Sequence, residues 1–372
     1  MAGRAGRILL SAGEPSGDLH GGPLVEALRA RLPGFELEAL GGGRMAAAGA
    51  IVRFPLEHYT VLGFAEILTR LPRHWRLLRR LERELAGGRF DLALLIDYPG
   101  FNVRLAEAAH RQGVPVLYYI APKYWASGAG RVARLARAVD RLAVILPFEQ
   151  EFFARAGIAT EFVGHPLLDR PSPPSRPAAR AALGLRSGER LLALFPGSRP
   201  QEVTRLWPAF RDAASRLRSQ GSCERVVVAA VGTASYPGSD GCELRRHDPA
   251  TILAAADAAL IKSGTATLEA ALADVPMVVA YRLHWLTAWL ARRLITVPWI
   301  SLVNLIGRQP LVAELLQHEV NAERLATALA PLLDPAGVAA CRQRDGFRLV
   351  RERLGSPGAA ERVAGLAAEL LA

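Results

Sequence analysis

The sequence contains very little cysteine. Three cysteines occur in 372 residues, and they stand far apart at Cys223, Cys242 and Cys341. This spacing matches no metal-binding motif, and three widely separated thiols do not build a disulfide framework. The scarcity therefore argues against a zinc module and against a small disulfide-stapled secreted protein. It favours a reducing cytoplasm.

Long apolar runs are missing as well. No stretch reaches the roughly 18 uninterrupted apolar residues that a membrane-spanning helix requires. The N-terminal segment enters a short apolar run that ends at Ser11, and this run is too short and wrongly flanked for a secretory signal. The sequence thus predicts a protein that is soluble or that rests on a membrane surface.

Acidic residues are too few to balance the basic ones. The chain has 46 Lys+Arg against 35 Asp+Glu, a net charge of +11, and the basic residues are almost all arginine. Such an excess indicates an anionic partner, which could be nucleic acid, an acidic membrane surface or a phosphorylated substrate. The hydrophobic share of 51% excludes a disordered chain, and the length predicts two domains.

One local pattern recurs in both halves of the chain: a short apolar strand, a glycine-rich polar turn and a helix. It predicts an α/β fold with two parallel, doubly wound, Rossmann-like sheets whose ligand edges face across a cleft. Residues 169–178 contain four prolines in ten positions and read as a linker. The expected parts are therefore a domain at 1–168, a second domain at 179–345 and a helical tail at 346–372.

The turn at Ser263–Gly264 follows an apolar strand within residues 256–280 and opens a helix. Thr265, Thr267 and Glu269 stand in the first turns of that helix. A helix start carries unpaired N–H groups and a positive dipole, and glycine permits close approach, so a phosphate can bind there. An ordinary capped helix has the same pattern, and this segment alone favours that simpler interpretation.

Polar residues also crowd the turn at 11–22, where Glu14, Ser16, Asp18 and His20 stand between glycines. A loop of this kind can line a substrate site, since glycine lets the backbone approach a ligand and the side chains supply polar groups. The alternative is a polar turn in which Asp18 caps a helix. The density of polar groups favours the substrate loop.

Two further residues follow strands directly. Asp97 comes after the apolar run 90–96, at the place where open α/β sheets bind ligands, and it is well placed to act as a general base or else to cap a helix. Arg199 lies in the turn that follows the strand at 190–195. Its guanidinium could grip a diphosphate through paired hydrogen bonds.

Residues 61–83 place apolar side chains at helical spacing among many arginines, and Pro72 is expected to kink or split this helix. Such a helix can lie on an anionic membrane, or it can pack on a core with its arginines in water. The residues predicted to face the membrane are Phe64, Ile67, Leu68, Leu71, Trp75, Arg76, Arg79 and Arg80. The segment 284–306 is also apolar and rich in tryptophan.

Seven blocks of sequence, in order, resemble the lipid-A-disaccharide synthase family, whose members are glycosyltransferases of the GT-B fold. The blocks are SAGEPSGDLH from Ser11, GGGRMAAAG from Gly41, IDYPGFN from Ile96, FVGHP from Phe162, FPGSRPQE from Phe195, SGTATLE from Ser263 and ISLVNLI from Ile300. They cover the chain from Ser11 almost to its end. Seven ordered blocks are far more specific than any single glycine loop.

The resemblance implies a reaction. 2,3-Diacylglucosamine would pass from UDP-2,3-diacylglucosamine to the 6-hydroxyl of 2,3-diacylglucosamine 1-phosphate, giving a β-1,6 disaccharide and UDP. Inversion at the anomeric carbon needs a base, for which Asp97 is the candidate. Arg199 and the helix start at Thr265 would stabilise the departing UDP without a metal or a cofactor. The C-terminal helix is expected to return to the N-terminal domain.

The resemblance also implies how the site is divided. The donor side would comprise Gly197, Ser198, Glu202, Ser263, Gly264, Thr265, Thr267, Glu269, Asn304 and Gln317. The acceptor side would comprise Glu14, Ser16, Asp18, His20 and Asn102. Because both substrates are acylated, the protein is expected in the cytoplasm, peripherally bound to the inner leaflet of the inner membrane through the arginine-rich helix. Whether it forms a homodimer stays open.

Three regions depart from the family pattern. The chain reads Asp97-Tyr-Pro-Gly-Phe-Asn where Asp-Ala-Pro-Asp-Phe-Asn is expected, the loop at 121–131 differs, and residues 231–248 look too short for the usual strand and helix. Alternatives are therefore a transferase for another lipid acceptor, a UDP-sugar epimerase or a non-catalytic membrane-binding relative. A nucleic-acid-binding protein would explain the charge, but the sequence has no known module of that class.

Overall fold

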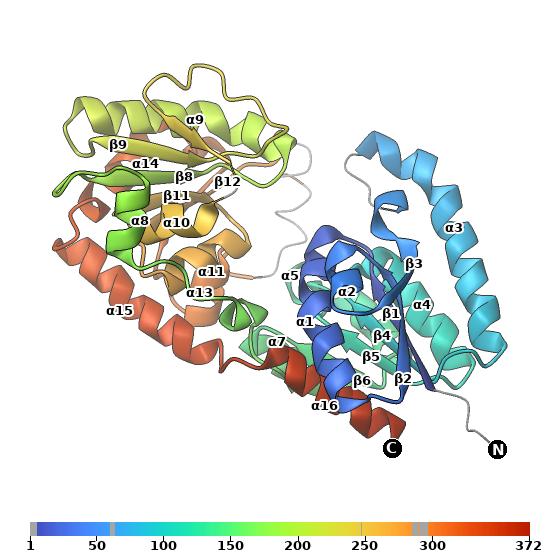
Figure 1. Ribbon diagram of the computed structural model, residues 1–372. Coiled ribbons are helices and arrows are strands. Elements are labelled where there is room, and N and C mark those ends of the chain that lie inside the picture. The colour runs from blue at the N-terminus through green and yellow to red at the C-terminus, as the bar shows by residue number, and fades with distance from the viewer. Residues whose placement is uncertain (1–5, 60–63, 247, 285–288, 290–296) are drawn as a thin grey trace. The chain divides into compact units, whose positions relative to one another are not determined.

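The computed structural model describes residues 6–59, 64–246, 248–284, 289 and 297–372, and these form two compact units (Figure 1). Unit 1 comprises Met1–Arg170 together with Leu354–Ala372, and unit 2 comprises Pro171–Arg353. The chain therefore passes between the units twice. Each unit is an α/β domain built on a parallel sheet, as the sequence predicts.

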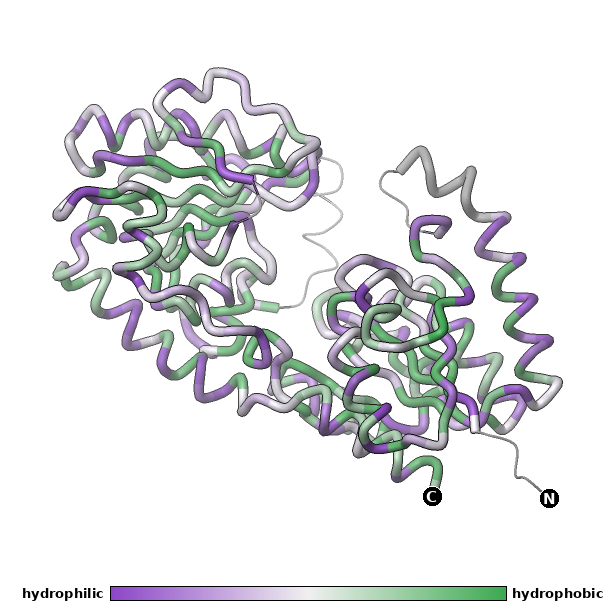
Figure 2. Tube along the Cα trace, in the orientation of Figure 1, coloured by the Kyte–Doolittle hydropathy of each residue, from purple (hydrophilic) through white to green (hydrophobic). Residues whose placement is uncertain are grey.

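Unit 1 contains seven parallel strands in the order β3-β2-β1-β4-β5-β6-β7. The strands are β1 (Gly6–Ala12), β2 (Phe35–Gly41), β3 (Ile51–Pro55), β4 (Leu92–Ile96), β5 (Val116–Tyr119), β6 (Arg141–Val144) and β7 (Thr160–Phe162). The central strand β4 is apolar throughout, as expected for a strand that helices cover on both faces, and Figure 2 shows apolar colour in this part of the sheet. The strand order reverses between β1 and β4, which marks the expected ligand edge.

The helices of unit 1 lie on both faces of its sheet. One face is covered by α1 (Pro15–Arg31), α2 (Gly43–Ala47) and α16 (Ala359–Leu371), and the other by α3 (Phe64–Ala86) and α4 (Pro99–Arg111). The short helices are η1 (Leu56–His58), α5 (Tyr124–Ser127), η2 (Ala129–Arg131), α6 (Val132–Ala136), α7 (Pro147–Ala154) and η3 (Pro166–Asp169). α16 packs along α1, so the expected return of the C-terminal helix is confirmed.

Unit 2 contains six parallel strands in the order β10-β9-β8-β11-β12-β13, and here the order reverses between β8 and β11. The strands are β8 (Leu191–Phe195), β9 (Arg225–Ala229), β10 (Glu243–Arg245), β11 (Ala258–Lys262), β12 (Met277–Tyr281) and β13 (Ala313–Leu316). The helices are α8 (Arg176–Ala182), α9 (Pro200–Ser219), α10 (Pro249–Ala255), α11 (Thr265–Leu272), α13 (Leu302–Gly307), η4 (Gln317–Glu319), α14 (Ala322–Leu329), η5 (Ala330–Leu332) and α15 (Val338–Arg353). α9 and α14 cover one face.

The second passage between the units lies later than the sequence suggests. The expected boundary at 345/346 falls inside α15, which packs on α11 and α13 of unit 2. Unit 1 resumes at Leu354, whose carbonyl accepts a hydrogen bond of 3.1 Å from the His165 N–H. Asp169 then caps α16, because its carboxylate accepts from the N–H groups of Gly358 and Ala359 at 2.5 and 3.1 Å.

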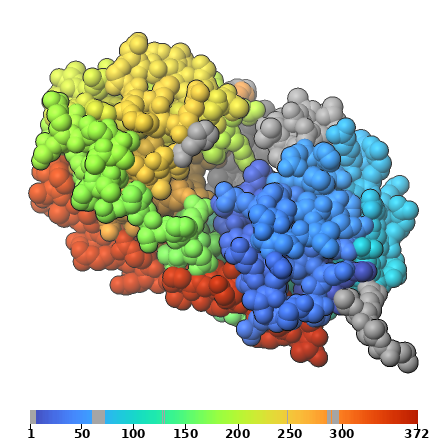
Figure 3. Space-filling model, viewed as in Figure 1, coloured from blue at the N-terminus to red at the C-terminus, as the bar shows by residue number. Residues whose placement is uncertain are grey.

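The region 231–248, which looks too short from the sequence, still contains a strand, β10. β10 has only three residues and pairs parallel with β9, and the described residues between them form a loop without a helix. The loop packs on α9 through Trp207, whose Nε1 donates to the Pro237 carbonyl at 2.9 Å and whose ring meets Tyr236 edge-on at 5.1 Å. It forms part of the outer surface of unit 2 (yellow, Figure 3). A loop held by aromatic contacts thus replaces the usual crossover helix.

α3 is one helix that contains Pro72, so the split considered from the sequence does not occur. In its C-terminal half Leu77, Leu78, Leu81 and Leu85 are buried, as expected for a helix that packs on a core. Within the described residues, no helix is at once long enough and apolar enough to cross a bilayer.

Candidate active site

Asp97 lies at the end of β4, in a turn that only strong local support can hold. It and Tyr98 both have left-handed backbone, with φ values of 47° and 51°. Such angles cost energy in residues that carry a side chain. Three hydrogen bonds hold the turn: Asp97 N–H donates to the Tyr119 carbonyl at 2.9 Å, and the Asp97 carbonyl accepts from Tyr118 Oη at 2.6 Å and Asn102 Nδ2 at 2.8 Å. The turn is therefore held in one shape.

Asn102 joins the two strands on either side of the order reversal. Its amide nitrogen contacts the carbonyls of Ser11 at 3.1 Å and Ile96 at 3.2 Å, and its amide oxygen accepts from Ser11 Oγ at 2.6 Å. The side chain is completely buried. From its buried position Asn102 therefore holds the ends of β1 and β4 together. This role differs from the acceptor-side contact that the resemblance implies.

The carboxyl group of Asp97 is half-buried at this edge. Burial is the main cause that raises its pKa, the negative charge of Glu14 adds to the effect, and Lys123 opposes it. A carboxylate with a raised pKa holds a proton more tightly and is a stronger base. Glu14 itself is half-buried just beyond β1, and Ser16 is exposed in the first turn of α1. The predicted base and two acceptor-side residues thus lie in neighbouring loops of one edge.

Asp18 has a different role from the one expected. Its carboxylate accepts hydrogen bonds from the backbone N–H groups of Gly42, Arg44 and Met45, at 2.8, 3.1 and 3.2 Å. These groups open α2, so Asp18 caps that helix from α1 and is buried in doing so. The structure supports the capping alternative, although the cap belongs to a neighbouring helix.

His20 lies near a second buried histidine. The pKa of His20 is lowered to about 4, chiefly by burial and also by the positive charge of Arg170. The pKa of His165 is lowered to about 3 by burial, by His20 and by Arg170. His165 Nδ1 accepts a hydrogen bond from the Leu167 N–H at 3.1 Å. Both rings are therefore neutral near pH 7. His20 is half-buried near Arg170, where the chain leaves unit 1, and it is not exposed in a substrate loop.

An aromatic group that sequence reasoning did not single out extends the edge. Tyr98 lies over Gly13, where a Cβ atom would overlap the tyrosine ring. Its Oη is 2.7 Å from His74 Nε2, and the His74 ring meets Tyr59 edge-on at 5.8 Å. Three separate segments supply these rings, so no local pattern could have grouped them.

In unit 2 the ends of β8 and β11 are neighbours, since Phe195 pairs with Ile261. The turn after β8 needs Gly197, which has φ of 141° and whose added Cβ would lie 2.6 Å from that of Glu202. Ser198 and Arg199 follow it and are exposed, and α9 begins directly afterwards. The predicted cation therefore stands at the N-terminal end of a helix, beside the strand-order reversal.

Glu202 organises this turn. Its carboxylate pairs with Lys262 Nζ at 2.9 Å and accepts from the Ser198 N–H at 3.0 Å. Hydrogen bonding and charge from Lys262 hold its pKa below the usual value, although burial acts in the opposite direction. Glu202 therefore positions the loop, and Lys262 joins Arg199 as a cation of this edge.

The polar side chains of the turn at Ser263–Gly264 differ in their surroundings. Thr267 is buried and its Oγ1 donates to the Gly264 carbonyl at 2.7 Å, so it serves the local turn. Ser263 Oγ donates to the Ile300 carbonyl at 3.0 Å. Thr265 is exposed at the first position of α11, where unpaired N–H groups of a helix point outward, and Glu269 is half-buried one turn later.

The side-chain amides of Asn304 and Gln317 form hydrogen bonds with backbone groups. Asn304 is buried, and its amide exchanges hydrogen bonds of 2.9 Å with the N–H and carbonyl of Val312 and donates to Glu314 at 2.8 Å. Glu314 also accepts from the backbone N–H groups of Ile300 and Ser301. The amide of Gln317 pairs with the backbone of Leu283, at 3.2 Å in both directions. Asn304 and Glu314 thus hold the segments on either side of α13, and Gln317 ties the end of β13 to the segment after β12.

The two lysines of the chain, Lys123 and Lys262, both stand near strand-end loops. Lys123 follows β5 and acts on the charge of Asp97, and Lys262 ends β11 and pairs with Glu202. In a chain whose other basic residues are arginine, the rarity of lysine is the sequence signal that could have singled them out. Neither appears among the predicted site residues.

The predicted membrane helix is described only in part. The side chains of Phe64, Ile67, Leu68 and Leu71 lie outside the described part of the chain. Trp75 is 45% exposed beneath the Arg104 guanidinium, and Arg76, Arg79 and Arg80 are exposed. Residues 285–288 and 290–296 of the tryptophan-rich segment also lie outside the described part of the chain. Among the described residues, no cluster of histidine, cysteine and acidic side chains could hold a metal ion.

Solved structures of low identity share this fold. The glycotransferase of kitacinnamycin is 19% identical, with 99% of this chain and 100% of that chain covered and a TM-score of 0.63. The UDP-GlcNAc 2-epimerase from Neisseria meningitidis bound to UDP-GlcNAc is 10% identical, with coverage of 98% and 99% and a TM-score of 0.64. The S. aureus MnaA–UDP structure is 14% identical, with coverage of 96% and 94% and a TM-score of 0.65. These similarities show the fold alone, which is the expected GT-B type.

Sequence relatives are far closer. A lipid-A-disaccharide synthase of Anaeromyxobacter dehalogenans is 41% identical over 369 residues, with 96% of each chain covered. That of Myxococcus xanthus is 40% identical, with 98% of this chain and 97% of the relative covered. The family model described as lipid-A-disaccharide synthetase matches residues 8–362. With such identity over nearly its whole length, the chain belongs to the lipid-A-disaccharide synthetase family.

Proposed function

We propose that the chain forms the lipid A disaccharide with Asp97 as general base and Arg199 as the main cation for the leaving group. As a member of its family the chain is a glycosyltransferase. The donor is UDP-2,3-diacylglucosamine, the acceptor is 2,3-diacylglucosamine 1-phosphate, and the products are the β-1,6 disaccharide 1-phosphate and UDP. The single observation that carries the residue assignment is the carboxyl group of Asp97, held at the strand-order reversal with a raised pKa.

On the acceptor side, Asp97 takes the proton of the 6-hydroxyl as the oxygen attacks the anomeric carbon of the donor. The new glycosidic bond forms as the bond to UDP breaks, so the configuration inverts. The turn around Asp97 is tied to Tyr118, Tyr119 and Asn102 by hydrogen bonds, and this support limits the reorganisation of the base during reaction. Glu14 raises the basicity of Asp97 through its negative charge.

On the donor side, negative charge grows on the diphosphate as the bond to the sugar breaks. Arg199 and the outward N–H groups of α11 at Thr265 receive that charge. Glu202 and Lys262 hold the turn that carries Arg199. A donor of the UDP-sugar class is supported by the UDP and UDP-GlcNAc in two structures of similar fold. Ser263 and Thr267 hold the turn before α11 through hydrogen bonds to the carbonyls of Ile300 and Gly264.

Both substrates are acylated, and we propose that α3 holds the enzyme at an anionic membrane surface. The exposed Trp75 together with Arg76, Arg79 and Arg80 supports this role, since tryptophan favours the interface and arginines favour anionic headgroups. The enzyme would then act peripherally at the inner leaflet. Replacing Arg76, Arg79 and Arg80 by glutamate should abolish co-sedimentation with anionic liposomes, and undiminished sedimentation would remove the membrane role from this helix.

The direct test of the reaction mixes the purified protein with UDP-diacylglucosamine and the acylated sugar phosphate and follows both UDP and disaccharide. Wild-type protein should release one UDP per disaccharide, and Asp97→Ala should lose both products together. A wild-type protein that releases no UDP would refute the proposal. Conversion of the donor to an epimerised UDP-sugar without disaccharide would indicate the epimerase alternative instead.

A further inference from the structure

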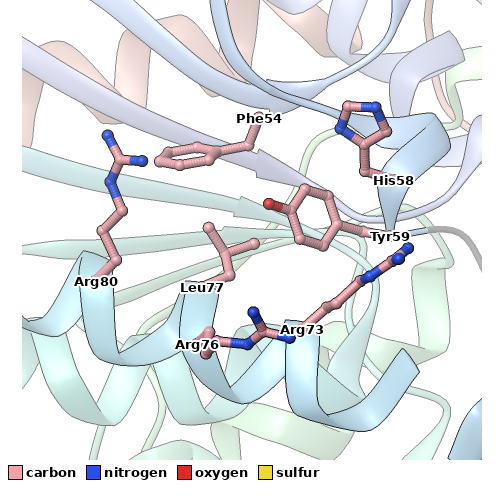
Figure 4. Close-up of a pocket in the computed structure, with 7 residues that line it drawn as sticks. All are labelled: Phe54, His58, Tyr59, Arg73, Arg76, Leu77 and Arg80. Carbon is pink, nitrogen blue, oxygen red and sulfur yellow. The ribbon is translucent and has the colours of Figure 1, made fainter. Parts of the chain in front are cut away.

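A pocket of unit 1 has no role in the reaction as described so far. It has a volume of about 460 Å³ and lies between α3 and the segment formed by β3 and η1 (Figure 4). Its lining includes Phe54, His58, Tyr59, Arg73, Arg76 and Arg80. The volume lies within the range of about 300–1,000 Å³ that is typical of small-molecule sites.

The pocket is strongly basic. Arg73, Arg76 and Arg80 line it together, and none of its described lining residues carries a carboxylate. Arg80 lies over the Phe54 ring at 5.1 Å and pairs with Glu84 at 3.0 Å, which fixes its guanidinium at one end. Arg73 and Arg76 are exposed, and they lie about one turn apart on the same face of α3 (Figure 4). Guanidinium groups gathered in this way repel one another until an anion with several acceptor oxygens lies among them.

The pocket also lies on the catalytic side of the sheet. His58 and Tyr59 follow the carboxyl end of β3, and the carboxyl ends of parallel strands share one edge. Tyr59 meets the ring of His74, and His74 Nε2 is 2.7 Å from Tyr98 Oη. Tyr98 is the residue directly after Asp97. A row of three rings thus joins the basic pocket to the proposed base.

We propose that this pocket binds the phosphate monoester of the acceptor while Asp97 takes the proton from the hydroxyl of the same sugar. The inference rests on the proposed function and adds a binding site to it. A phosphate monoester carries a charge of about −1.5 to −2 at neutral pH and three acceptor oxygens, which match several guanidinium N–H groups. The pocket would thereby distinguish a phosphorylated acceptor from an acyl sugar without phosphate.

The test compares the double variant Arg73→Ala/Arg76→Ala with Arg83→Ala, which removes an exposed arginine from the same helix outside the pocket. Kinetics are measured in micelles of a neutral detergent without phospholipid. The double variant should raise the acceptor KM at least about tenfold, the cost of losing charge-assisted hydrogen bonds. Its donor KM and kcat should stay within about twofold, and Arg83→Ala should match the wild type.

The second part of the test repeats these kinetics with an acceptor that lacks the phosphate. Its KM with wild-type protein should be raised by a similar factor, and the double variant should lose no more with it, because the interacting group is already absent. An equal loss with both acceptors would contradict a phosphate contact. Thermal unfolding of both variants at the wild-type temperature establishes that the exposed substitutions leave the fold intact.

Vesicle binding tests whether the pocket binds the phosphate of the acceptor or the phosphate of membrane headgroups. If the double variant keeps its acceptor KM in micelles and loses only its sedimentation with phosphatidylglycerol vesicles, the pocket binds bilayer headgroups and the proposal is wrong. Acceptor binding is also measured by calorimetry without donor. Phosphate-dependent binding that falls in the double variant, in a protein that makes no disaccharide, would refute the proposed function and retain the pocket.

Discussion

The strand-end edges of the two units are built alike and carry opposite charge. Unit 1 reverses its strand order between β1 and β4 and presents Glu14 and Asp97. Unit 2 reverses between β8 and β11 and presents Arg199 and Lys262. The shared fold supplies the place for a ligand, and the side chains at that place decide the chemistry. One edge suits removal of a proton, and the other suits a departing diphosphate.

A buried asparagine stabilises each edge, but in different places. Asn102 ties the ends of β1 and β4 to the turn that carries Asp97. Asn304 ties α13 to the segment before β13 through Val312 and Glu314. The asparagine of unit 1 therefore contacts the turn that carries Asp97, whereas that of unit 2 acts at β13, which β11 and β12 separate from β8 and the turn of Arg199.

The largest expected effect comes from removing the carboxylate of Asp97 at the strand-end edge of unit 1. Asp97→Asn keeps the size of the side chain and removes the base, so kcat for disaccharide formation should fall by roughly 10³-fold, within the range of general-base catalysis. The donor KM, measured in the same assay, should change little. A loss of less than about tenfold would mean that another group takes the proton.

The pH profile sharpens the role of the second carboxylate. Because the pKa of Asp97 is raised, activity should decline as the pH falls through a value above the usual aspartate range, where the base becomes protonated. Glu14→Gln removes a negative charge that raises this pKa, so the acidic limb of kcat/KM should move to lower pH. An unmoved limb would show that Glu14 does not act on the base.

The next effect should come from the basic edge. Arg199→Ala removes the exposed cation at the start of α9, and kcat/KM for the donor should fall by about 10²-fold. Arg199→Lys should recover part of this loss, since it restores the charge without the paired geometry. If the acceptor KM rose instead, the assignment of the two edges to the two substrates would be wrong.

The two asparagine clamps offer a matched comparison of stability. Asn102→Ala and Asn304→Ala each leave buried polar groups unpaired and should lower the free energy of unfolding by about 1–3 kcal/mol. Urea denaturation measures both. At equal stability loss, only Asn102→Ala should also lower kcat, because only that clamp holds the carbonyl of Asp97. Equal losses of kcat would remove this distinction.

The last prediction concerns a dependence of stability on pH in unit 1. Glu149 is completely buried between Trp125 Nε1 and the Leu146 N–H, and burial raises its pKa to about 7 from an ordinary 4.5. The folded form then holds its proton more tightly than the unfolded form, so this stabilisation is complete below about pH 4.5 and is lost as the pH rises through about 7. The difference between a pKa of 4.5 and one of about 7 corresponds to a change on the order of 3 kcal/mol in urea denaturation, and Glu149→Gln should flatten it.

The candidate positions of Asp97 and Arg199 could be predicted because their signals are local. Asp97 comes directly after β4 and Arg199 lies in the turn after β8, and a parallel sheet brings such strand ends to one edge of each unit. The partners of Asp18 and Glu202 could not be predicted, because the N–H groups of α2 and the amine of Lys262 come from other segments. The same holds for the row of rings from Tyr59 to Tyr98.

The sequence by itself determined the class of fold and the family, and it predicted candidate positions for the chemistry, since strand periodicity, glycine turns and ordered motifs are written in short segments. Only the tertiary structure decided which polar residues remain for substrates. Asp18, Asn102, Glu202 and Asn304 all look available in the sequence, yet each is held by groups on other segments. A buried polar group must find a partner, and the fold alone decides which partner is within reach.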